Sequence, residues 1–210
     1  GDGKTWATAV PELADALKAA KSNSSITEIW VAKGTYYPLY DAATLGCSPT
    51  DNRDKAFVMV NNVKVYGGFA GGEATINQRD FISNETILSG DIGASNNTTD
   101  NCYHVVIGAG TVNNLGTSLD GFTISGGNAN AYTASINVNG FSIDKNKGGG
   151  IYIESSSPMI KNCTVSNNHA EEYGGGILTD HSSSPDILNC KVIGNTLYSG
   201  PADASYRGGC

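Results

Sequence analysis

The sequence predicts an all-β fold, a parallel β-helix of stacked coils that follows a single amphipathic helix. Three observations predict it. Gly, Asn, Ser and Thr make up 85 of the 210 residues, and these turn-forming types separate short apolar runs. Only 16% of the residues are charged, which leaves few of the long charged side chains that fill helical bundles. A segment late in the chain repeats itself, which indicates stacked structural units.

Residues 11–21 have helical periodicity, and no other segment does. The apolar residues that share one face of this helix are Leu13, Ala16, Leu17 and Ala20. Pro11 suits a first helical turn, and the negative charge of Glu12 complements the helix dipole there. We therefore expect a helix over residues 11–21 that covers the first coil, with Trp6 and Val10 packed beside it.

The apolar runs after this helix are short, and several alternate with the period of two that is typical of strands. We expect strands at residues 29–32, 63–67, 86–89, 104–107, 121–125, 151–153, 162–165, 177–179 and 189–193. In the run that starts at residue 151, Ile151 and Ile153 are expected to face inward. Tyr152 and Glu154 are then expected to face outward.

Residues 148–163 read GGGIYIESSSPMIKNC, and residues 174–190 repeat them as GGGILTDHSSSPDILNC. A weaker copy, LDGFTISGG, covers residues 119–127. Strands this short bury their inward side chains only if successive copies stack. The expected inward columns are Phe122–Cys163–Cys190 and Ile124–Val165–Val192. Asn168 and Asn195 each follow a column cysteine by five residues, so we expect an asparagine ladder inside a turn.

The repeat also predicts the organisation of the chain. We expect residues 1–22 to form the cap with its helix and residues 23–210 to form the coils, the last copy breaking off at Gly208–Gly209–Cys210. The strand edges of a last coil pair readily with other strands. We therefore expect residues 198–209 to cover this end, or the chain to self-associate through its open C-terminal coil.

The charge balance is acidic, with 13 Lys+Arg against 20 Asp+Glu and a net charge of −7. Binding of nucleic acids or anionic membranes depends on clustered positive charge, so the balance excludes both as main partners. No run approaches the 18 apolar residues of a membrane-spanning helix. The low Lys and high Asn, Ser and Thr content favours a secreted or cell-surface protein whose signal peptide has been removed.

The chain has five cysteines, which cannot all pair with one another. Cys163 and Cys190 share one inward column, where their side chains point in parallel, so we expect a reduced apolar stack. Cys47 and Cys102 lie in loops and are free to pair or not. The pairing of Cys210 is equally open.

A series of motifs carries a family resemblance. GDGKTWATAVPELADALKAA, EIWVAKGTYYP, VYGGFAGGE, TILSGDIG, LDGFTISGGNA and GGGIYI occur in this order over nearly the whole chain. The sequence resembles the N-terminal part of bacterial surface proteins with a right-handed parallel β-helix, similar to polymorphic outer-membrane proteins. The resemblance implies a pectate-lyase-like fold, export to the cell surface or outer membrane, and an N-terminal helical cap. It implies no reaction.

The first candidate site combines Glu154, Asp180 and His181. The two carboxylates occupy the same position in successive copies of the repeat, and adjacent strands lie only about 4.8 Å apart. Two such carboxylates repel each other unless one is protonated or a cation lies between them. An acid/base pair and a Ca²⁺ site on one exposed groove wall are the functional interpretations. The alternative is a pair of turn residues that point into water.

The second candidate site is the loop of residues 91–101, DIGASNNTTDN. Oxygen atoms of Asp91, Asn96, Asn97 and Asp100 offer the hard ligands that Ca²⁺ prefers, and Gly93 provides a bend. Their spacing does not match an EF-hand. A polar loop without a metal is the alternative.

The third candidate is Arg53 in the segment 51–55, DNRDK, together with Arg79. Polysaccharide lyases with the pectate-lyase-like fold that the resemblance implies use Ca²⁺-bound acidic groups with an Arg or Lys base. The Asp-Asp, Gly-His-Gly and Arg-Ile-Lys signatures of polygalacturonases are absent, so we favour a salt-bridged loop that braces the early coils.

Two further groups of residues are weaker candidates. By its offset within the repeat, His104 aligns with Gly121 and Asn162, which predicts a position in a hydrogen-bonded ladder. Six aromatic side chains could stack on sugar rings if they are exposed, although packing at the edges of the coils is the preferred interpretation for most of them: Trp30, Tyr36, Tyr37, Tyr40, Tyr66 and Tyr152.

Three function classes remain. A surface scaffold or adhesin module that binds polysaccharide or a host glycan is preferred, because stacked repeats present columns of like side chains to extended polymers. A polysaccharide lyase or glycoside hydrolase is the alternative, and a purely structural stalk is the second alternative. Fold resemblance alone does not decide between them.

Overall fold

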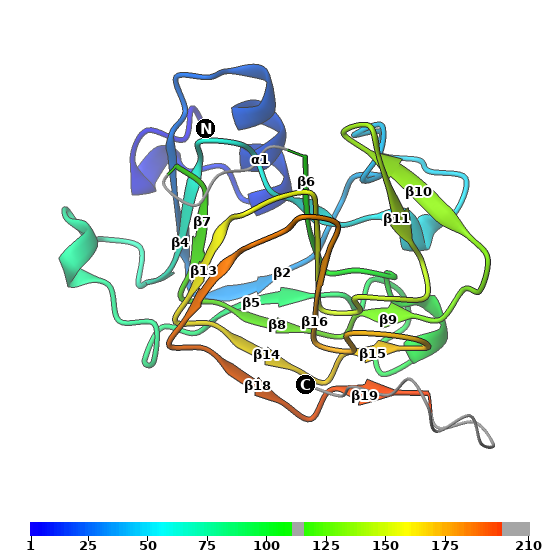
Figure 1. Ribbon diagram of the computed structural model, residues 1–210. Helices are drawn as coiled ribbons and strands as arrows, with labels where there is room; N and C mark the ends of the chain where they lie inside the picture. The colour runs from blue at the N-terminus through cyan, green and yellow to red at the C-terminus, as the bar shows by residue number, and fades with distance from the viewer. Residues whose placement is uncertain (111–115, 199–210) are drawn as a thin grey trace.

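The structure is a computed structural model that describes residues 1–110 and 116–198 (Figure 1). It is mostly β, with parallel sheets. The described residues contain one α-helix, α1 (Leu13–Ser22), and short 3-10 turns at η1 (Trp6–Thr8), η2 (Asn52–Asp54), η3 (Ile76–Gln78) and η4 (Thr98–Asp100). The expected all-β class and the helix near the N-terminus are therefore confirmed.

Four parallel sheets make up the body of the protein, and we number them 1 to 4. Sheet 1 contains β3 (Phe57–Val58), β6 (Val106–Ala109), β12 (Ile151–Glu154) and β16 (Ile177–Asp180). Sheet 2 contains β1 (Glu28–Ala32), β4 (Lys64–Phe69), β7 (Ser118–Asp120), β13 (Met159–Lys161) and β17 (Asp186–Leu188). Sheet 3 contains β2 (Gly34–Tyr36), β5 (Thr86–Ser89), β8 (Thr123–Ser125), β14 (Thr164–Ser166) and β18 (Lys191–Ile193). Sheet 4 contains β9 (Asn128–Ala129), β15 (His169–Ala170) and β19 (Thr196–Leu197).

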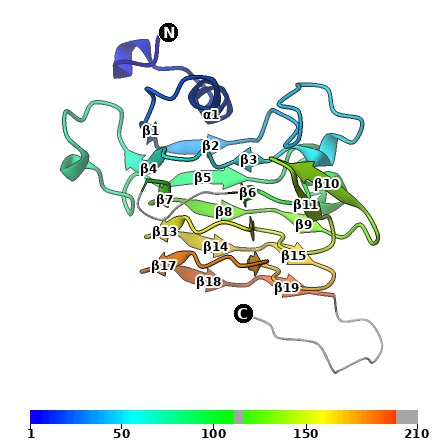
Figure 2. The same cartoon turned by 45° about the horizontal axis from the view of Figure 1, so that its top comes forward.

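The chain visits these sheets in a constant order. From β12 it passes through sheets 1, 2, 3 and 4, and it then repeats the same order from β16 to β19. Each return adds a strand beside the strand of the previous passage, as the stacked arrows of Figure 2 show. The nine expected strands all coincide with or overlap observed ones. The strands that the sequence pattern missed are two to four residues long, too short to show a period.

The register confirms the repeat. Ile151 pairs with Ile177, and Val165 pairs with both Ile124 and Val192, as the aligned copies predict. The asparagine ladder is confirmed as well. The side-chain amide of Asn168 donates to Asn195 Oδ1 at 3.0 Å and to the carbonyl of Ile124 at 3.1 Å.

The glycine triplets allow these passages to approach one another closely. Gly148 has a positive φ of 65°, in the left-handed region that favours glycine. Gly149 is needed for a different reason, because a Cβ there would lie 2.1 Å from the carbonyl oxygen of His169. The backbone conformation therefore requires glycine at the first position of the triplet, and the lack of room for a Cβ requires glycine at the second.

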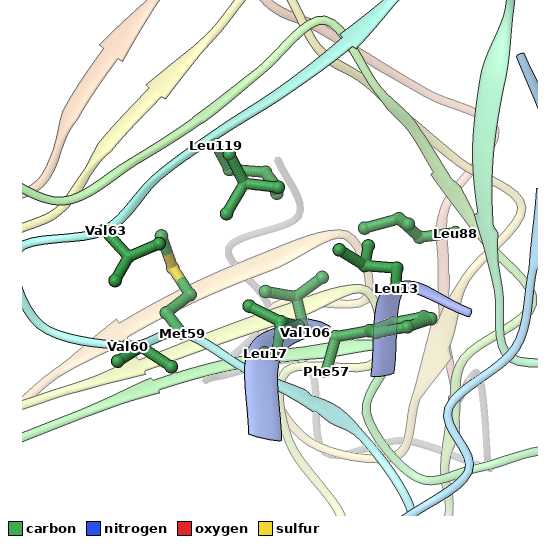
Figure 3. A pocket seen from close by; sticks show the side chains of 10 residues that line it. Leu13, Leu17, Phe57, Met59, Val60, Val63, Leu88, Val106 and Leu119 are labelled. Atoms are coloured by element: carbon green, nitrogen blue, oxygen red, sulfur yellow. The ribbon is translucent and has the colours of Figure 1, made fainter. Parts of the chain in front are cut away.

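Helix α1 lies across one end of the stacked strands (Figure 2). It begins after Glu12, the N-cap residue, so Pro11 precedes the helix instead of occupying its first turn. Its buried face consists of Leu13, Ala14, Leu17 and Ala20. Ten apolar side chains enclose a gap of only about 20 Å³ beneath the helix (Figure 3). A gap of this size and lining stays dry, so it is a packing space and not a ligand site. Trp6 packs on Trp30 and Phe69, whose rings stack at 4.7 Å.

A β-hairpin, β10 (Ser135–Val138) with β11 (Phe141–Asp144), packs on the outer face of sheet 1. Val138 and Ile143 form a second apolar cluster there with Tyr152, which is fully buried. The expected strand alternation is right, but the outward face is not exposed at Tyr152 and Glu154. The hairpin directly precedes β12 in the chain and packs against Tyr152, and the alternation within β12 carries no information about this packing.

The last passage leaves apolar side chains exposed on β17 and β18: Ile187, Leu188, Val192 and Ile193. The segment that is expected to cover this end, and the start of the next copy at Gly208–Gly209–Cys210, lie outside the described residues. Self-association through this end stays a prediction. In the part of the chain that the structure describes, no helix is long and apolar enough to cross a membrane.

Candidate functional sites

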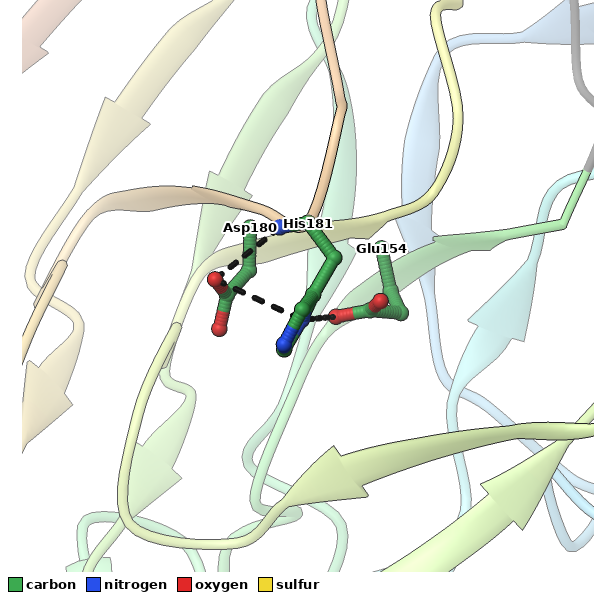
Figure 4. Close-up of side chains that lie close together, drawn as sticks. All are labelled: Glu154, Asp180 and His181. Atoms are coloured by element: carbon green, nitrogen blue, oxygen red, sulfur yellow. Dashed lines mark hydrogen bonds and ion pairs between the residues drawn. The ribbon is translucent and has the colours of Figure 1, made fainter.

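The structure brings Glu154, Asp180 and His181 together (Figure 4). Glu154 ends β12, Asp180 ends β16, and the two residues pair in register. His181 Nδ1 lies 3.1 Å from Glu154 Oε2 and 3.5 Å from Asp180 Oδ1. One ligand atom from each of the three residues lies within 4.8 Å of the others. The stacking that the repeat predicts therefore places these side chains in one cluster.

The members of this cluster differ in exposure. The Glu154 side chain is 5% exposed, whereas that of His181 is 74% exposed. The expected exposed groove wall is thus correct for His181 and wrong for Glu154, which lies on the face that the hairpin covers. The hydrogen bond to Glu154, followed by the charge of Asp180, raises the pKa of His181.

Arg53 does not join this cluster. Its guanidinium donates to the backbone carbonyls of Asn101 at 2.7 Å and Asn128 at 2.6 Å, and it lies over the ring of Tyr103. The nearby Asp54 forms an ion pair of 2.6 Å with Lys145. This arrangement agrees with the expected bracing role of the segment 51–55.

Arg79 has a similar role between passages. Its guanidinium forms an ion pair of 2.8 Å with Asp120 and donates to the carbonyls of Gly67 and Asp120. Both arginines therefore fasten neighbouring backbone segments together, and their donors are already engaged.

Several side-chain oxygens of the loop of residues 91–101 already accept hydrogen bonds from other residues of the same loop. Asp100 Oδ2 accepts hydrogen bonds from the backbone of Ala94 and from the side chain of Asn97. Asn97 Oδ1 accepts from Thr99, so it already serves the loop. Asp91 Oδ1, Asp100 Oδ1 and Asn101 Oδ1, in contrast, are buried without a hydrogen-bond partner among the described residues. Asn97 Oδ1 is therefore engaged within the loop, whereas Asp91 and Asp100 each keep one oxygen without a partner among the described residues.

Calcium binding by this loop stays a prediction. Calorimetric titration of the protein with CaCl₂ is expected to give a saturable heat, with a dissociation constant in the range of about 10⁻⁴–10⁻³ M that is typical of extracellular modules. The Asp100→Asn variant is expected to lose this heat, because one charge of the ligand set is removed. Asp2→Asn, at an exposed position outside the loop, is the control. Equal heats for both variants would contradict the prediction.

A polar groove lies along sheet 4, and sequence reasoning did not find it. Its volume is about 440 Å³. The lining residues are Thr98, Asn101, Gly127, Asn128, Asn130, Asn167, Asn168, His169, Gly194 and Thr196. None of these carries a formal charge while His169 is neutral. Side-chain amides, hydroxyls and an imidazole thus form a neutral surface that both donates and accepts hydrogen bonds.

The repeat contains the signal that would have revealed this groove. Asn128, His169 and Thr196 each follow a residue of the Phe122–Cys163–Cys190 column by six positions. The structure pairs His169 with Asn128 on one side and with Thr196 on the other, and His169 Nδ1 lies 3.0 Å from Thr196 Oγ1. These three side chains form one polar column along the groove.

The aromatic side chains lie mostly elsewhere. Tyr152 is fully buried and Trp30 stacks on Phe69. Of the aromatic residues singled out in the sequence, only Tyr37 is exposed, at 42%. The structure adds two exposed tyrosines, Tyr132 and Tyr198. Desolvation, followed by the charge and hydrogen bond of Glu171 and then the charge of Glu172, raises the pKa of Tyr132. Tyr132 and Tyr198 follow the groove residues Asn130 and Thr196 by two positions.

The four cysteines that the structure describes are free thiols. Cys163 and Cys190 therefore form the reduced stack that the repeat predicts, and burial raises the pKa of Cys163. Cys102 is buried, which raises the pKa of its thiol to about 12, whereas Cys47 is exposed. Cys210 lies outside the described residues.

His104 occupies a position different from the expected one. It precedes β6 in sheet 1, so it does not stack with Gly121 and Asn162, which lie beside sheets 2 and 3. Its Nδ1 lies 2.9 Å from the carbonyl oxygen of Gly148, and Tyr152 packs edge-on against its ring. Its Nε2 is buried without a partner among the described residues. Burial lowers the pKa of His104 to about 4, so this imidazole is neutral at pH 7.

No family model matches this chain, and neither does any curated protein or solved structure. Function therefore has to be inferred from the two sites themselves. The Glu154–Asp180–His181 cluster can transfer protons or bind a cation, because it combines two carboxylates with an imidazole. The groove along sheet 4 can bind a neutral polyhydroxy compound, because its lining offers donors and acceptors without charge.

Proposed function

We propose that this chain is a right-handed parallel β-helix module of an exported surface protein and that it binds a neutral polysaccharide. The constant order in which the chain visits four parallel sheets supports the β-helix, as does the in-register pairing of the repeats. The series of motifs that resembles bacterial surface proteins supports export. Under this proposal the module is a binding scaffold and not a catalyst.

The groove along sheet 4 is the observation that carries the binding proposal. Its volume of about 440 Å³ lies within the range of about 300–1,000 Å³ that is common for ligand sites. Sugar hydroxyls both donate and accept hydrogen bonds, and His169 and Thr196 offer both kinds of partner. Asn128, at the buried end of the column, donates to the carbonyl of Thr98. The exposed rings of Tyr132 and Tyr198 provide apolar faces on which a sugar ring can stack.

The charge of the molecule favours a neutral ligand over an acidic one. The groove is lined by neither Lys nor Arg, and the chain as a whole carries a net charge of −7. A uronic-acid polymer needs cationic partners for its carboxylates, which this lining does not supply. The same charge balance argues against nucleic acids as partners.

The test is affinity electrophoresis in gels that contain soluble β-glucan, xylan or mannan, with polygalacturonate as the acidic comparison. We expect at least one neutral polymer to retard the protein and polygalacturonate to leave its mobility unchanged. His169→Ala is expected to weaken binding at least tenfold, a loss of about 1.4 kcal/mol, because it removes the middle of the polar column. His181→Ala is the matched control, since it changes an exposed histidine outside the groove.

The possible outcomes separate the function classes. Retardation that His169→Ala and His181→Ala reduce equally would place the binding outside the groove and overturn the proposal. Absence of retardation by every polymer would favour the structural stalk.

A second candidate function is polysaccharide cleavage at the Glu154–Asp180–His181 cluster. The observation that favours it is the approach of two carboxylates and an imidazole within 4.8 Å. Retaining glycosidases place their two carboxyl groups about 5 Å apart, so this spacing is compatible with catalysis. New reducing ends that appear with the wild type and disappear with Glu154→Gln would support cleavage.

A host glycan is the alternative ligand of the groove along sheet 4. A glycan array with the wild type, His169→Ala and His181→Ala tests this alternative.

A further inference from the structure

We propose that Glu154, Asp180 and His181 form a binding site for a divalent transition-metal ion of the Zn²⁺ type. This inference is independent of polysaccharide binding, because the cluster shares no residue with the groove along sheet 4. It rests on the geometry of three ligand atoms, on their chemistry, and on the contacts that hold them.

The distances suit a small tetrahedral ion. Zn–N and Zn–O bonds of about 2.0–2.2 Å at tetrahedral angles place two ligand atoms about 3.3–3.5 Å apart. His181 Nδ1 lies 3.1 Å from Glu154 Oε2 and 3.5 Å from Asp180 Oδ1. The two distances from Nδ1 therefore match this spacing, and one ligand atom from each of the three residues lies within 4.8 Å of the others.

The ligand set selects the class of ion. Ca²⁺ and Mg²⁺ take oxygen ligands, whereas imidazole nitrogen suits Zn²⁺, Cu²⁺ and Ni²⁺. Two carboxylates with one imidazole form a mixed oxygen and nitrogen set of three. Zn²⁺ sites with three protein ligands keep a fourth position for water, and the His181 side chain, 74% exposed, lies at the solvent side of the cluster.

Neighbouring hydroxyl groups orient both carboxylates. Ser155 Oγ donates to Glu154 Oε1 at 3.0 Å, which leaves Oε2 directed to the histidine. Tyr152 Oη donates to Asp180 Oδ2 at 3.5 Å, which leaves Oδ1 on the same side. Hydrogen bonds of this kind commonly fix metal-ligating carboxylates. Asp180 Oδ1 also accepts a hydrogen bond from the backbone N–H of His181 at 3.0 Å, and Glu154 Oε2 faces His181 Nδ1, so both oxygens lie on the side of the imidazole.

The charge balance also calls for a cation. The Glu154 side chain is more than nine-tenths buried, yet among the described residues it has no Lys or Arg partner. A protonated His181 compensates one of the two negative charges, whereas a divalent ion compensates both.

The experiment is calorimetric titration of the full chain with ZnCl₂ at pH 7.5, followed by Co²⁺ titration with visible absorption. We expect one high-affinity equivalent of Zn²⁺ in the wild type, and the intense visible bands of tetrahedral Co²⁺. His181→Ala is expected to weaken the first equivalent at least tenfold and to remove the Co²⁺ bands. His169→Ala is the matched control and is expected to leave both unchanged. Because His181 is exposed, its substitution spares the packed interior, and a thermal melt verifies that the variant folds.

Three results would overturn this proposal. The first is a wild type that gives no heat with ZnCl₂. The second is an equal first equivalent in the wild type and in His181→Ala, which would assign the ion to another site such as a thiol. The third is loss of the first equivalent in His169→Ala. Failure of the polysaccharide proposal would appear in the electrophoresis with His169→Ala, so the two failures remain distinguishable.

Discussion

Replacing Asn168 by alanine is expected to lower the free energy of unfolding by about 2–6 kcal/mol. Asn168 is buried, and its Oδ1 accepts from the backbone N–H of Gly127 at 2.9 Å. Its Nδ2 donates to the carbonyls of Ile124 and Ser166 and to Asn195 Oδ1. The alanine variant leaves the Gly127 N–H and the Ile124 carbonyl buried without these partners, and each such loss costs about 1–3 kcal/mol.

Urea unfolding, followed by circular dichroism, measures this effect. Asn77→Ala is the matched control, because Asn77 is exposed and surface substitutions change stability by about 0.5 kcal/mol or less. Similar midpoints for the two variants would show that the ladder does not stabilise the stacked passages. A loss confined to Asn168→Ala would assign the stabilisation to the interior of the turn.

The second large effect concerns pH. The stability of the protein is expected to fall by about 3 kcal/mol between pH 7.5 and pH 4 through His104 alone. The folded-state pKa of His104 is about 4 because the ring is buried, and the unfolded value is 6.5. Between these values the unfolded chain binds the proton and the folded protein does not. The stabilisation is therefore complete above pH 6.5 and is lost as the pH falls toward 4.

The structure explains why the proton is excluded. His104 Nδ1 donates to the carbonyl of Gly148, so the neutral ring carries its proton on Nδ1. The second proton of a charged ring would sit on Nε2, which is buried and has no acceptor among the described residues. A buried charge without a partner is costly, so the folded protein keeps the imidazole neutral.

The measurement is the free energy of unfolding in urea at pH 7.5 and at pH 4.5, for the wild type and for His104→Asn. Asparagine can still donate to Gly148 but does not titrate, so the variant is expected to lose less stability on acidification than the wild type. An identical pH dependence in the wild type and in His104→Asn would refute the role of His104.

His181 affects stability in the opposite sense. Because its pKa is raised in the folded protein, it adds stability at pH values below its unfolded pKa, and that stability is lost as the pH rises through the folded pKa.

His169 and His181 make the two proposed sites separable. His169 belongs to the polar column of the groove, and His181 belongs to the carboxylate cluster. Each substitution is the control for the other, in the electrophoresis and in the metal titration. A protein in which each variant loses only its own function would have two independent sites on different sheets.

Much of the cluster was predictable from the repeat. Glu154 and Asp180 occupy equivalent positions in two copies, and strands that stack in register place equivalent residues side by side. The cover over this face of β12 was not predictable, because the hairpin of β10 and β11 that packs there around Tyr152 has no counterpart in the other copies. The groove was predictable in part. Its column of Asn128, His169 and Thr196 follows the repeat, but Thr98 comes from a loop outside it.

The sequence by itself determined the mostly β class, the helix near the N-terminus, the strand register in the repeats and the asparagine ladder of Asn168 and Asn195. These features follow from three periods in the spacing of residues along the chain. They are the period of 3.6 residues of a helix, the period of two residues of a strand, and the length of the repeated segment. Only the tertiary structure decided the cover over Tyr152, the backbone carbonyls to which Arg53 donates, the position of His104 and the groove along sheet 4. Each of these depends on contacts between segments that have no periodic relation to one another, and residue spacing carries no information about such contacts.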